Sequence, residues 1–155
     1  MRLKLIQNKN QDEVEVQIIY SEMNNTVKTL IDKIKTSQSK LIGYRDNEKM
    51  VIKAEEILYI ESVDKKTFLY CNNAVYQSQL KLYQVREVLK NLNFAQISKS
   101  CILNIDMLIS IRPLANSRME AVIISGERLN VNRKFIPQIK EMLKKERADI
   151  NETDY

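Results

Sequence analysis

Residues 97–104, with the sequence ISKSCILN, constrain the fold of this chain more than any other segment. The segment starts and ends as an apolar strand, but Ser98, Lys99 and Ser100 are polar and consecutive. A half-buried strand alternates apolar and polar side chains with a period of two, so these three residues cannot all face a core. The chain must turn outward here and present two hydroxyls and one cation. On its own, such a triplet is most often an ordinary solvated loop.

Short strand-like segments separated by polar turns dominate the chain after residue 40. They predict strands at residues 41–44, 49–52, 57–62, 67–71, 75–78, 94–98, 101–104, 108–112, 119–124 and 128–131. Hairpin turns are expected at Asn72-Asn73, where asparagine tolerates a positive φ, and at Gly126. Apolar residues at helical spacing predict one helix over residues 82–92 and a final helix capped by Asn132. The pattern indicates a mainly β domain with helices, an α+β fold.

Residues 1–40 carry a separate pattern. Residues 3–6 and 14–20 alternate like two short strands, and Ser21 is placed to cap a following helix. The apolar positions of that helix recur at spacings of three and four, at Val27, Leu30, Ile31 and Ile34. This strand-strand-helix unit has too little core to fold alone, so we expect it to pack on the rest of the chain or on another copy. We expect its role to be dimerisation or regulation.

The composition argues against an enzyme. The chain has no histidine, the commonest general base and transition-metal ligand, and its two glycines exclude a glycine-rich phosphate loop. Cys71 and Cys101 lack the spacing of a zinc site and are expected to be reduced core residues. A redox role for Cys101, beside the polar turn, is the alternative, and it needs a lowered thiol pKa. We find no catalytic or metal-binding cluster and expect no cofactor.

The charge distribution favours a polyanionic partner. The net charge is +5, and residues 41–147 hold 18 basic and 12 acidic side chains, while residues 148–155 hold only three acidic ones. A positive body suits a polyanion such as nucleic acid. No apolar run is long enough to span a bilayer, and the N-terminus lacks the features of a signal peptide, so we expect a cytoplasmic protein.

Three polar tips follow predicted strands, at residues 62–67, 98–100 and 132–134. Each tip holds one or two cations beside hydroxyl or amide groups, and a β-rich core could project all three to one side. Separately they are loops. Together they are typical of a reading surface built from loops rather than from a recognition helix.

The order of motifs along the chain is more specific. YIES at residues 59–62, a helix over residues 80–89, Phe94 before ISKSCILN, GERL at residues 126–129 and VNR at residues 131–133 occur in sequence. Over roughly residues 41–145 the chain therefore resembles the LytTR DNA-binding domain family of bacterial transcription regulators. The resemblance implies an elongated antiparallel β-sheet with a small packed helix. It also implies loops that enter successive major grooves of double-stranded DNA with imperfect direct repeats, and a bent duplex.

The resemblance also assigns roles to the three tips. Base contacts fall to Thr67, Lys99 and Arg133. Contacts with the DNA backbone fall to their neighbours Ser62, Lys65, Lys66, Ser98, Ser100, Asn132 and Lys134. Family members often carry His or Arg in the first loop and Asn or His-Arg in the second, so Thr67 and Lys99 depart from the pattern and no operator sequence is implied. Arg133 matches the commonest choice in the third loop, and Arg suits bidentate recognition of guanine.

The expected organisation is an extension at residues 1–40, a LytTR-type domain at residues 41–148 and an acidic tail at residues 149–155. Most family members join this domain to a much longer phosphorylation-controlled receiver. The short extension here resembles that of the stand-alone regulators. This resemblance implies a homodimer, at least on DNA, and a small membrane protein that acts as an inhibitor.

Two other functions remain open at this level. The β body could be a regulatory module that docks on a partner protein and no longer reads DNA. A basic β surface could also bind RNA, but exposed aromatic side chains for base stacking are missing from the three tips. Preference for duplex over single strands, and dependence on Lys99 and Arg133, would favour DNA reading.

Overall fold

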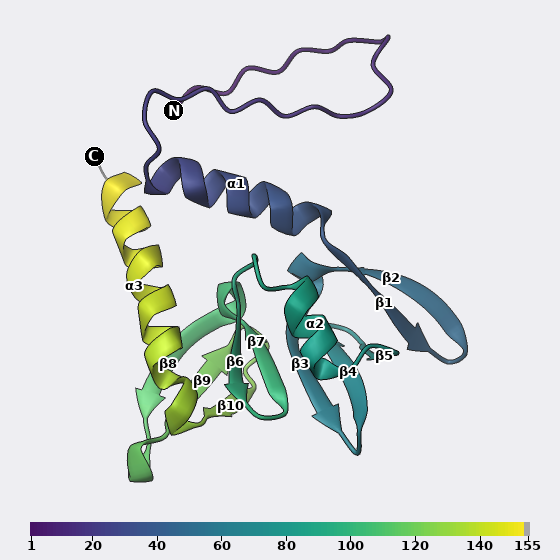
Figure 1. Cartoon of the computed structure of the whole chain (residues 1–155), viewed down its shortest axis with the longest axis vertical. Coiled ribbons are helices and arrows are strands. Elements are labelled where there is room, and N and C mark those ends of the chain that lie inside the picture. The colour runs from purple at the N-terminus through teal and green to yellow at the C-terminus, as the bar shows by residue number, and fades with distance from the viewer. Residues whose placement is uncertain (154–155) are drawn as a thin grey trace.

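The computed structural model describes the backbone of residues 1–153 and the side chains of residues 1–35 and 39–145. Figure 1 shows the arrangement of its helices and strands. In chain order these are α1 (Asn25–Gln38), β1 (Lys40–Arg45), β2 (Glu48–Lys53), β3 (Ile57–Val63), β4 (Lys66–Cys71), β5 (Val75–Ser78), α2 (Leu82–Val88), β6 (Phe94–Ser98), β7 (Cys101–Asn104), β8 (Leu108–Pro113), β9 (Met119–Ile123), β10 (Arg128–Val131) and α3 (Ile136–Thr153).

Two antiparallel sheets form the body of the molecule. The larger sheet has the strand order β2-β1-β5-β4-β3-β7-β6, and the smaller has the order β10-β9-β8. Two-residue turns, Asp46-Asn47 and Asp64-Lys65, connect β1 to β2 and β3 to β4. All four residues have φ between 50° and 65°, which is the conformation of a type I′ hairpin turn. The predicted α+β class, with a mainly antiparallel β body, is confirmed.

The larger sheet carries a core on each face. One cluster contains Val85 of α2 and Leu89, which directly follows that helix, together with Ile57 and Ile60 of β3. The other cluster joins β3, β6 and β7 to the smaller sheet and to Ile139 of α3. Because β3 supplies side chains to both clusters, its first four residues are all buried. This explains why the sequence there is continuously apolar instead of alternating.

Helix α1 has the predicted apolar face but a different start. The Val27 N–H donates to the Asn24 side-chain oxygen at 3.0 Å, so Asn24 caps the helix and the expected cap at Ser21 is wrong. Asparagine is as good a cap as serine, and Ser21 lies a full turn too early. Val27 is buried and the other apolar positions are half-buried. The helix contacts α3 and the short turn Ala54–Glu56, and it therefore packs on the rest of the chain.

The two strands expected at residues 3–6 and 14–20 are not formed. The backbone there has a turn at Lys9-Asn10 but no strand, and most of its large apolar side chains are exposed. An isolated two-stranded hairpin is marginal in water because nothing covers its apolar face. Residues 1–22, called the arm below, form two limbs that run side by side near α1 and away from the sheets (Figure 1).

Smaller differences concern turns and helix ends. Asn72 and Asn73 are not among the residues with positive φ, although the hairpin forms and the Cys71 N–H donates to the Ala74 carbonyl at 2.9 Å. Helix α2 ends at Val88, earlier than expected, because the chain turns there while Leu92 still reaches the core.

The C-terminal helix also differs from expectation. Asn132 makes no side-chain capping bond, and α3 begins only at Ile136. The backbone of α3 continues to Thr153, into the expected acidic tail. The side chains of that tail and residues 154–155 lie outside the described residues. Among the helices that the structure describes, none is long and apolar enough to cross a membrane.

Candidate nucleic-acid interface

The first predicted tip is the turn between β3 and β4. Lys65 is exposed at its apex, and Lys66 is exposed beside it. Thr67 lies within the ladder, opposite Ser62 of β3 and Ser78 of β5, and only 2% of its surface is exposed. The side chain predicted to contact a base is therefore buried between neighbouring strands. We remove Thr67 from the candidate interface because no base can reach it in this structure.

The second predicted tip, Ser98-Lys99-Ser100, is the turn between β6 and β7. The Ser98 hydroxyl accepts a hydrogen bond from the Ser100 N–H at 3.2 Å and lies 3.4 Å from the Ser100 hydroxyl. The two serines thus close the turn on themselves, as serine side chains commonly do in loops. Lys99 is left as the exposed residue. The outward turn predicted from three consecutive polar residues is confirmed.

The third predicted tip follows β10. Asn132, Arg133 and Lys134 are all exposed, and the last two begin the short turn Arg133–Phe135. The Lys134 ammonium lies 5.7 Å from the centroid of the Phe135 ring, which directs this side chain along the surface of its own loop.

Main-chain hydrogen bonds join the three tips at their bases. The Ser62 N–H donates to the Ser100 carbonyl at 2.8 Å, and the Asn132 N–H donates to the Ile97 carbonyl at 2.9 Å. The first tip is thereby attached to the second, and the third tip to the strand that leads into the second. Three segments that are far apart in the sequence are thus fixed beside one another.

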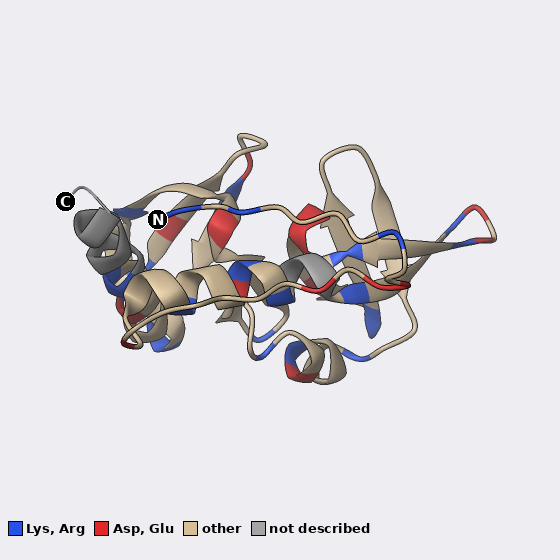
Figure 2. Cartoon of the chain, turned by 90° about the horizontal axis from the view of Figure 1, so that it is seen from above, with Lys and Arg blue, Asp and Glu red and all other residues tan. Residues whose placement is uncertain are grey.

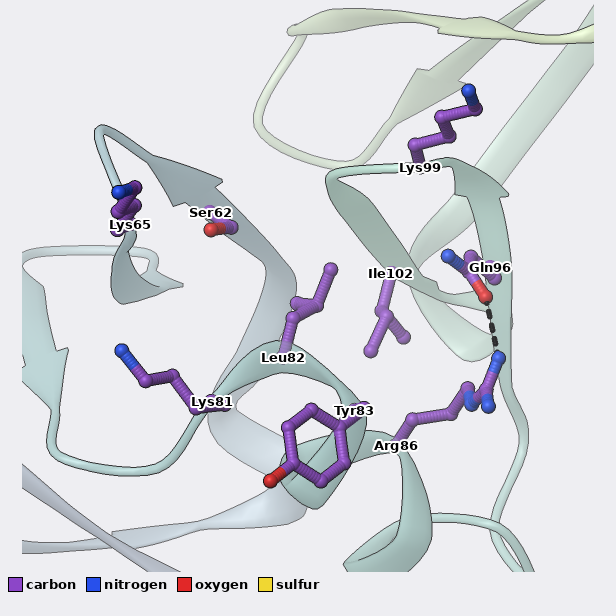
Figure 3. A pocket seen from close by; sticks show the side chains of 9 residues that line it. All are labelled: Ser62, Lys65, Lys81, Leu82, Tyr83, Arg86, Gln96, Lys99 and Ile102. Carbon is purple, nitrogen blue, oxygen red and sulfur yellow. Dashed lines mark hydrogen bonds between the residues drawn. The ribbon is translucent and has the colours of Figure 1, made fainter.

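A groove of about 520 Å³ lies between the first two tips and α2 (Figure 3). Three of its lining residues, Ser62, Lys65 and Lys99, were predicted from the sequence. The others are Lys81, Leu82, Tyr83, Arg86, Gln96 and Ile102. In Figure 3, Lys81, Leu82, Tyr83 and Arg86 come from α2 and its start, opposite the two hairpin turns.

Sequence reasoning missed the contribution of α2. Its apolar residues were assigned to a core, and the complementary outward face, which carries Lys81, Tyr83 and Arg86, was not considered. The signal was present, because the helical spacing of Leu82, Val85 and Leu89 places Lys81 and Arg86 at the two sides of the apolar stripe, where they can reach solvent.

The cations of the groove differ from two arginines of the smaller sheet, which are paired with an acidic side chain. Arg112 and Arg128 both contact Glu120, at 2.7 Å and 3.3 Å. In the part of the chain whose side chains are described, no ion pair involves Lys65, Lys81, Arg86 or Lys99, and no carboxylate lines the groove. Like charges gathered without counter-charges create a positive potential that attracts polyanions.

Arg86 is held in place by a neutral partner. One guanidinium nitrogen donates to the Gln96 side-chain oxygen at 2.9 Å (Figure 3). A guanidinium has five N–H donors, so this contact orients the group and leaves others for a phosphate. Gln96 thereby bridges α2 and β6 at the side of the groove.

Tyr59 links the larger sheet to the hairpin that precedes the third tip. Its hydroxyl donates to a Glu127 carboxylate oxygen at 2.6 Å, and its ring stacks on Tyr70 with centroids 4.3 Å apart. Burial, followed by the bond to Glu127, raises the pKa of Tyr59 above its ordinary value. The phenol therefore remains a donor at all ordinary pH values and keeps the turn between β9 and β10 against β3.

The environment of Cys101 argues against a redox function. The thiol is buried directly after the second tip, and burial, with a smaller contribution from Glu61, raises its pKa to about 12. Reactive cysteines need the opposite shift, because the thiolate is the nucleophile. Burial likewise raises the pKa of Cys71 to about 11.

Known proteins share this architecture. The structure resembles the LytTr DNA-binding domain of a methyl-accepting/DNA response regulator from Bacillus cereus, with a TM-score of 0.64 and 20% identity, over 68% of this chain and 97% of that one. An HTH-type transcriptional regulator of Staphylococcus aureus (strain MRSA252) is 26% identical over 145 residues, which are 92% of this chain and 98% of that protein.

A longer relative matches over a smaller share of its length. The sensory transduction protein LytT of Enterococcus faecalis is 24% identical over 110 residues, which are 70% of this chain and 46% of that protein. The model of the LytTr DNA-binding domain family matches residues 47–144, more than half of the chain and all three tips. The chain therefore belongs to the LytTr DNA-binding domain family.

Proposed function

We propose that this protein is a transcription regulator that binds specific sequences of double-stranded DNA through its three tips. The observation that supports this most strongly is the set of cations without an acidic partner around the groove, which come from two tips joined by a main-chain bond and from α2 with its start. A duplex presents rows of phosphates that such a surface neutralises. Family membership and the names of the relatives agree with this function.

Lys99 and Arg133 are the proposed base-reading side chains. Both are exposed at tips, and both carry donors suited to the acceptor atoms of guanine in the major groove. Thr67 is not retained, because it is buried. Ser98 and Ser100 keep a positioning role through their mutual contact.

Phosphate contacts are proposed for the exposed cations around the base-reading residues. These are Lys65 and Lys66 of the first tip, Lys134 of the third, and Lys81 and Arg86 of α2. Ser62 and Asn132 offer hydrogen-bonding side chains at the same surface. Such contacts fix the register of a protein on DNA but carry little sequence information.

The finer features of the proposal come from the family resemblance. They are imperfect direct repeats in the DNA, bending of the duplex, a homodimer on DNA and restraint by a small membrane protein. The proposed cytoplasmic location comes instead from the sequence, which has no apolar run long enough to span a bilayer and no features of a signal peptide at its N-terminus. Co-purification from membranes with and without a crosslinker tests the inhibitor separately.

A regulatory module that docks on a protein is the competing function. It predicts that duplex DNA binds weakly and independently of sequence. The decisive experiment titrates a labelled duplex, selected by genome-wide footprinting, at several salt concentrations. The tips and α2 offer enough cations to neutralise about three to five phosphates per protomer, so log K should fall against log salt with a slope of roughly −3 to −5.

The controls separate sequence-specific binding from non-specific electrostatic attraction to DNA. A scrambled duplex and a single strand of the same length test specificity. Lys49→Ala removes an exposed cation of β2, which three strands separate from β3, and should leave the affinity unchanged. A slope near zero, or equal affinity for every sequence, would contradict the proposed function.

A further inference from the structure

The larger sheet has an open face, which is the side of β2, β1, β5 and β4 that lies away from α2. Side chains alternate between the two sides of a strand. Leu41 of β1 and Ile52 of β2 belong to the core cluster that contains Val85 of α2. Their neighbours Ile42 and Val51 therefore point to the other side. Over β3, β6 and β7 the smaller sheet and α3 cover that side, but they do not extend over β1 and β2.

Apolar and aromatic side chains occupy the centre of the open face. Ile42 lies directly opposite Val51 in the ladder, and the two residues are 37% and 58% exposed. Tyr44 follows on the same side of β1 and is half-buried. Tyr70 of β4, farther along the sheet, lies opposite Val75, which is also exposed. An antiparallel sheet with one side in water normally presents polar side chains there, so an apolar centre indicates an interaction surface.

Three lysines border the apolar pair Ile42–Val51. Lys40 and Lys53 are exposed and lie directly opposite each other, two residues along each strand from that pair. Lys49 is exposed on the same side, two residues from Val51 in the other direction. These residues are called the rim lysines below. In the part of the chain whose side chains are described, none of them takes part in an ion pair.

The fold alone does not account for the rim lysines. Like charges directly opposite each other destabilise a ladder. Lysine on an edge strand prevents pairing with other sheets, but Lys40 is on β1, which is not an edge. Among the described residues of β1, β2, β4 and β5, no acidic side chain lies on the open face. Glu61 of β3 lies only at its border, opposite Phe68. The open face thus matches a partner with acidic side chains.

The spacing of these groups fits a helix. Strand residues rise about 3.3 Å each, so Lys49 and Lys53 lie about 13 Å apart along β2, with Val51 midway. Residues i and i+7 of an α-helix are about 10.5 Å apart on one face, with i+3 and i+4 between them. The flexible stems of lysine cover the remaining distance.

We propose that the open face binds an amphipathic helix of a partner protein, in which acidic residues at i and i+7 flank apolar residues at i+3 and i+4. The carboxylates meet the rim lysines, and the apolar side chains cover Ile42 and Val51. This is the mode in which an amphipathic helix places its apolar side on a hydrophobic surface.

The partner and DNA would occupy different sides of the molecule. The groove is lined by α2 and its start (Figure 3), whereas the open face is the side of the sheet away from α2. In Figure 1 the hairpin of β1 and β2 also projects away from the smaller sheet and α3. A helix bound to the open face therefore leaves the groove accessible, and the proposal holds whether or not the tips read DNA.

The test begins with a photo-crosslinking amino acid at Val51 of the full chain in host cells. Ile109 of β8 is the matched control position, because it is also an exposed apolar residue of a strand. Mass spectrometry identifies the peptide that is joined to each position. Val51, and not Ile109, should be joined to a segment of another protein with the acidic and apolar pattern given above.

A synthetic peptide of that segment then titrates the purified full chain. Lys40→Glu with Lys53→Glu should weaken binding at least about tenfold, because attraction becomes repulsion. Like charges still face each other in this variant, so the cost within the ladder is unchanged. Lys140→Glu with Lys144→Glu makes the same change in net charge at exposed residues of α3 and should bind like the parent.

A second peptide, in which lysine replaces the two acidic residues, makes the test independent of stability. It should bind the Lys40→Glu, Lys53→Glu variant more tightly than it binds the parent, which an unfolded variant could not do. The proposal is overturned if Val51 gives no crosslink beyond that of Ile109, or is joined to a second copy, to nucleic acid or to a segment without the pattern. Equal weakening by both double variants, or no preference of the second peptide, would also overturn it. None of these measurements uses DNA, so the proposed function is tested separately.

Discussion

The first and second tips are both hairpin turns in a polar sequence, yet they present their side chains differently. In the first, the backbone reverses at Asp64 and Lys65 in the left-handed conformation, and the ladder resumes at once, so that Thr67 is buried. In the second, two residues, Lys99 and Ser100, likewise lie between the strands, but the Ser98 hydroxyl bonds to Ser100 across the turn, and only Lys99 is exposed.

Because both turns have two residues, the difference shows that the position of a polar residue relative to the ladder decides whether it is available to a ligand. In a two-residue turn only the apex and its neighbours stand clear of the neighbouring strands. A residue two positions past the apex already belongs to the ladder and alternates between faces. The side chain of Thr67 is therefore buried in the sheet, although its motif implies a contact with a base.

The largest expected effect contrasts Lys99 with Thr67. Lys99→Ala should weaken binding to the specific duplex by about 1–3 kcal/mol, because an exposed base contact is lost. Thr67→Val keeps the branched shape and should change the affinity by less than about 0.5 kcal/mol. Titration of each variant with the same duplex, alongside thermal melting, measures both. A loss from Thr67→Val as large as that from Lys99→Ala would restore Thr67 as a base contact.

Arg133→Ala extends the comparison to the third tip. The expected loss is also about 1–3 kcal/mol, concentrated on one base pair of the operator. Competition with duplexes that carry single base changes locates this pair. If the variant binds all duplexes like the parent, the third tip does not read DNA and the interface is limited to the groove.

Lys65→Gly should raise stability and lower affinity together. Lysine is strained at a φ of 65°, and glycine is not, so we expect stabilisation by about 0.5–1 kcal/mol. Loss of one phosphate contact should weaken DNA binding roughly threefold to tenfold. Asn47→Gly is the matched control, because this residue also has a φ of 65° in the turn between β1 and β2 and has no charge. Loss of affinity in both variants would make turn rigidity, rather than the cation, the cause.

The smallest expected effect concerns Cys101, next to the exposed second tip. Its raised pKa of about 12 keeps the thiol protonated at pH 8, and burial restricts access to it. A thiol-reactive reagent should modify it slowly in the native protein and quickly after denaturation, and mild oxidation should leave DNA binding unchanged. Rapid native modification with loss of binding would reinstate the redox alternative.

Much of the fold could be predicted from local patterns. The ten strands of the sheets and the apolar faces of the three helices follow from side-chain periodicity, which records burial on one face. The same use of periodicity gave a wrong prediction for the arm, where no strands form. Residues 3–6 and 14–20 have a strand-like pattern, but the rest of the chain offers their apolar face nothing to pack against.

The candidate site was predictable only in part. Lys65, Lys99 and Arg133 are exposed as their motifs indicate. The burial of Thr67 depends on pairing with both β3 and β5, and the approach of Arg86 to Gln96 depends on how α2 packs on the sheet. Both are long-range consequences of topology, which no local pattern contains.

The main-chain bonds at the bases of the tips have a consequence for the evolution of target choice. The bonds from Ser62 to Ser100 and from Asn132 to Ile97 involve no side-chain atoms, so they survive every substitution at the donors except proline, which has no N–H. The exposed residues can then diverge while the spacing of the loops stays constant. A lineage of such proteins can therefore acquire new operators one apex residue at a time, without losing folding stability.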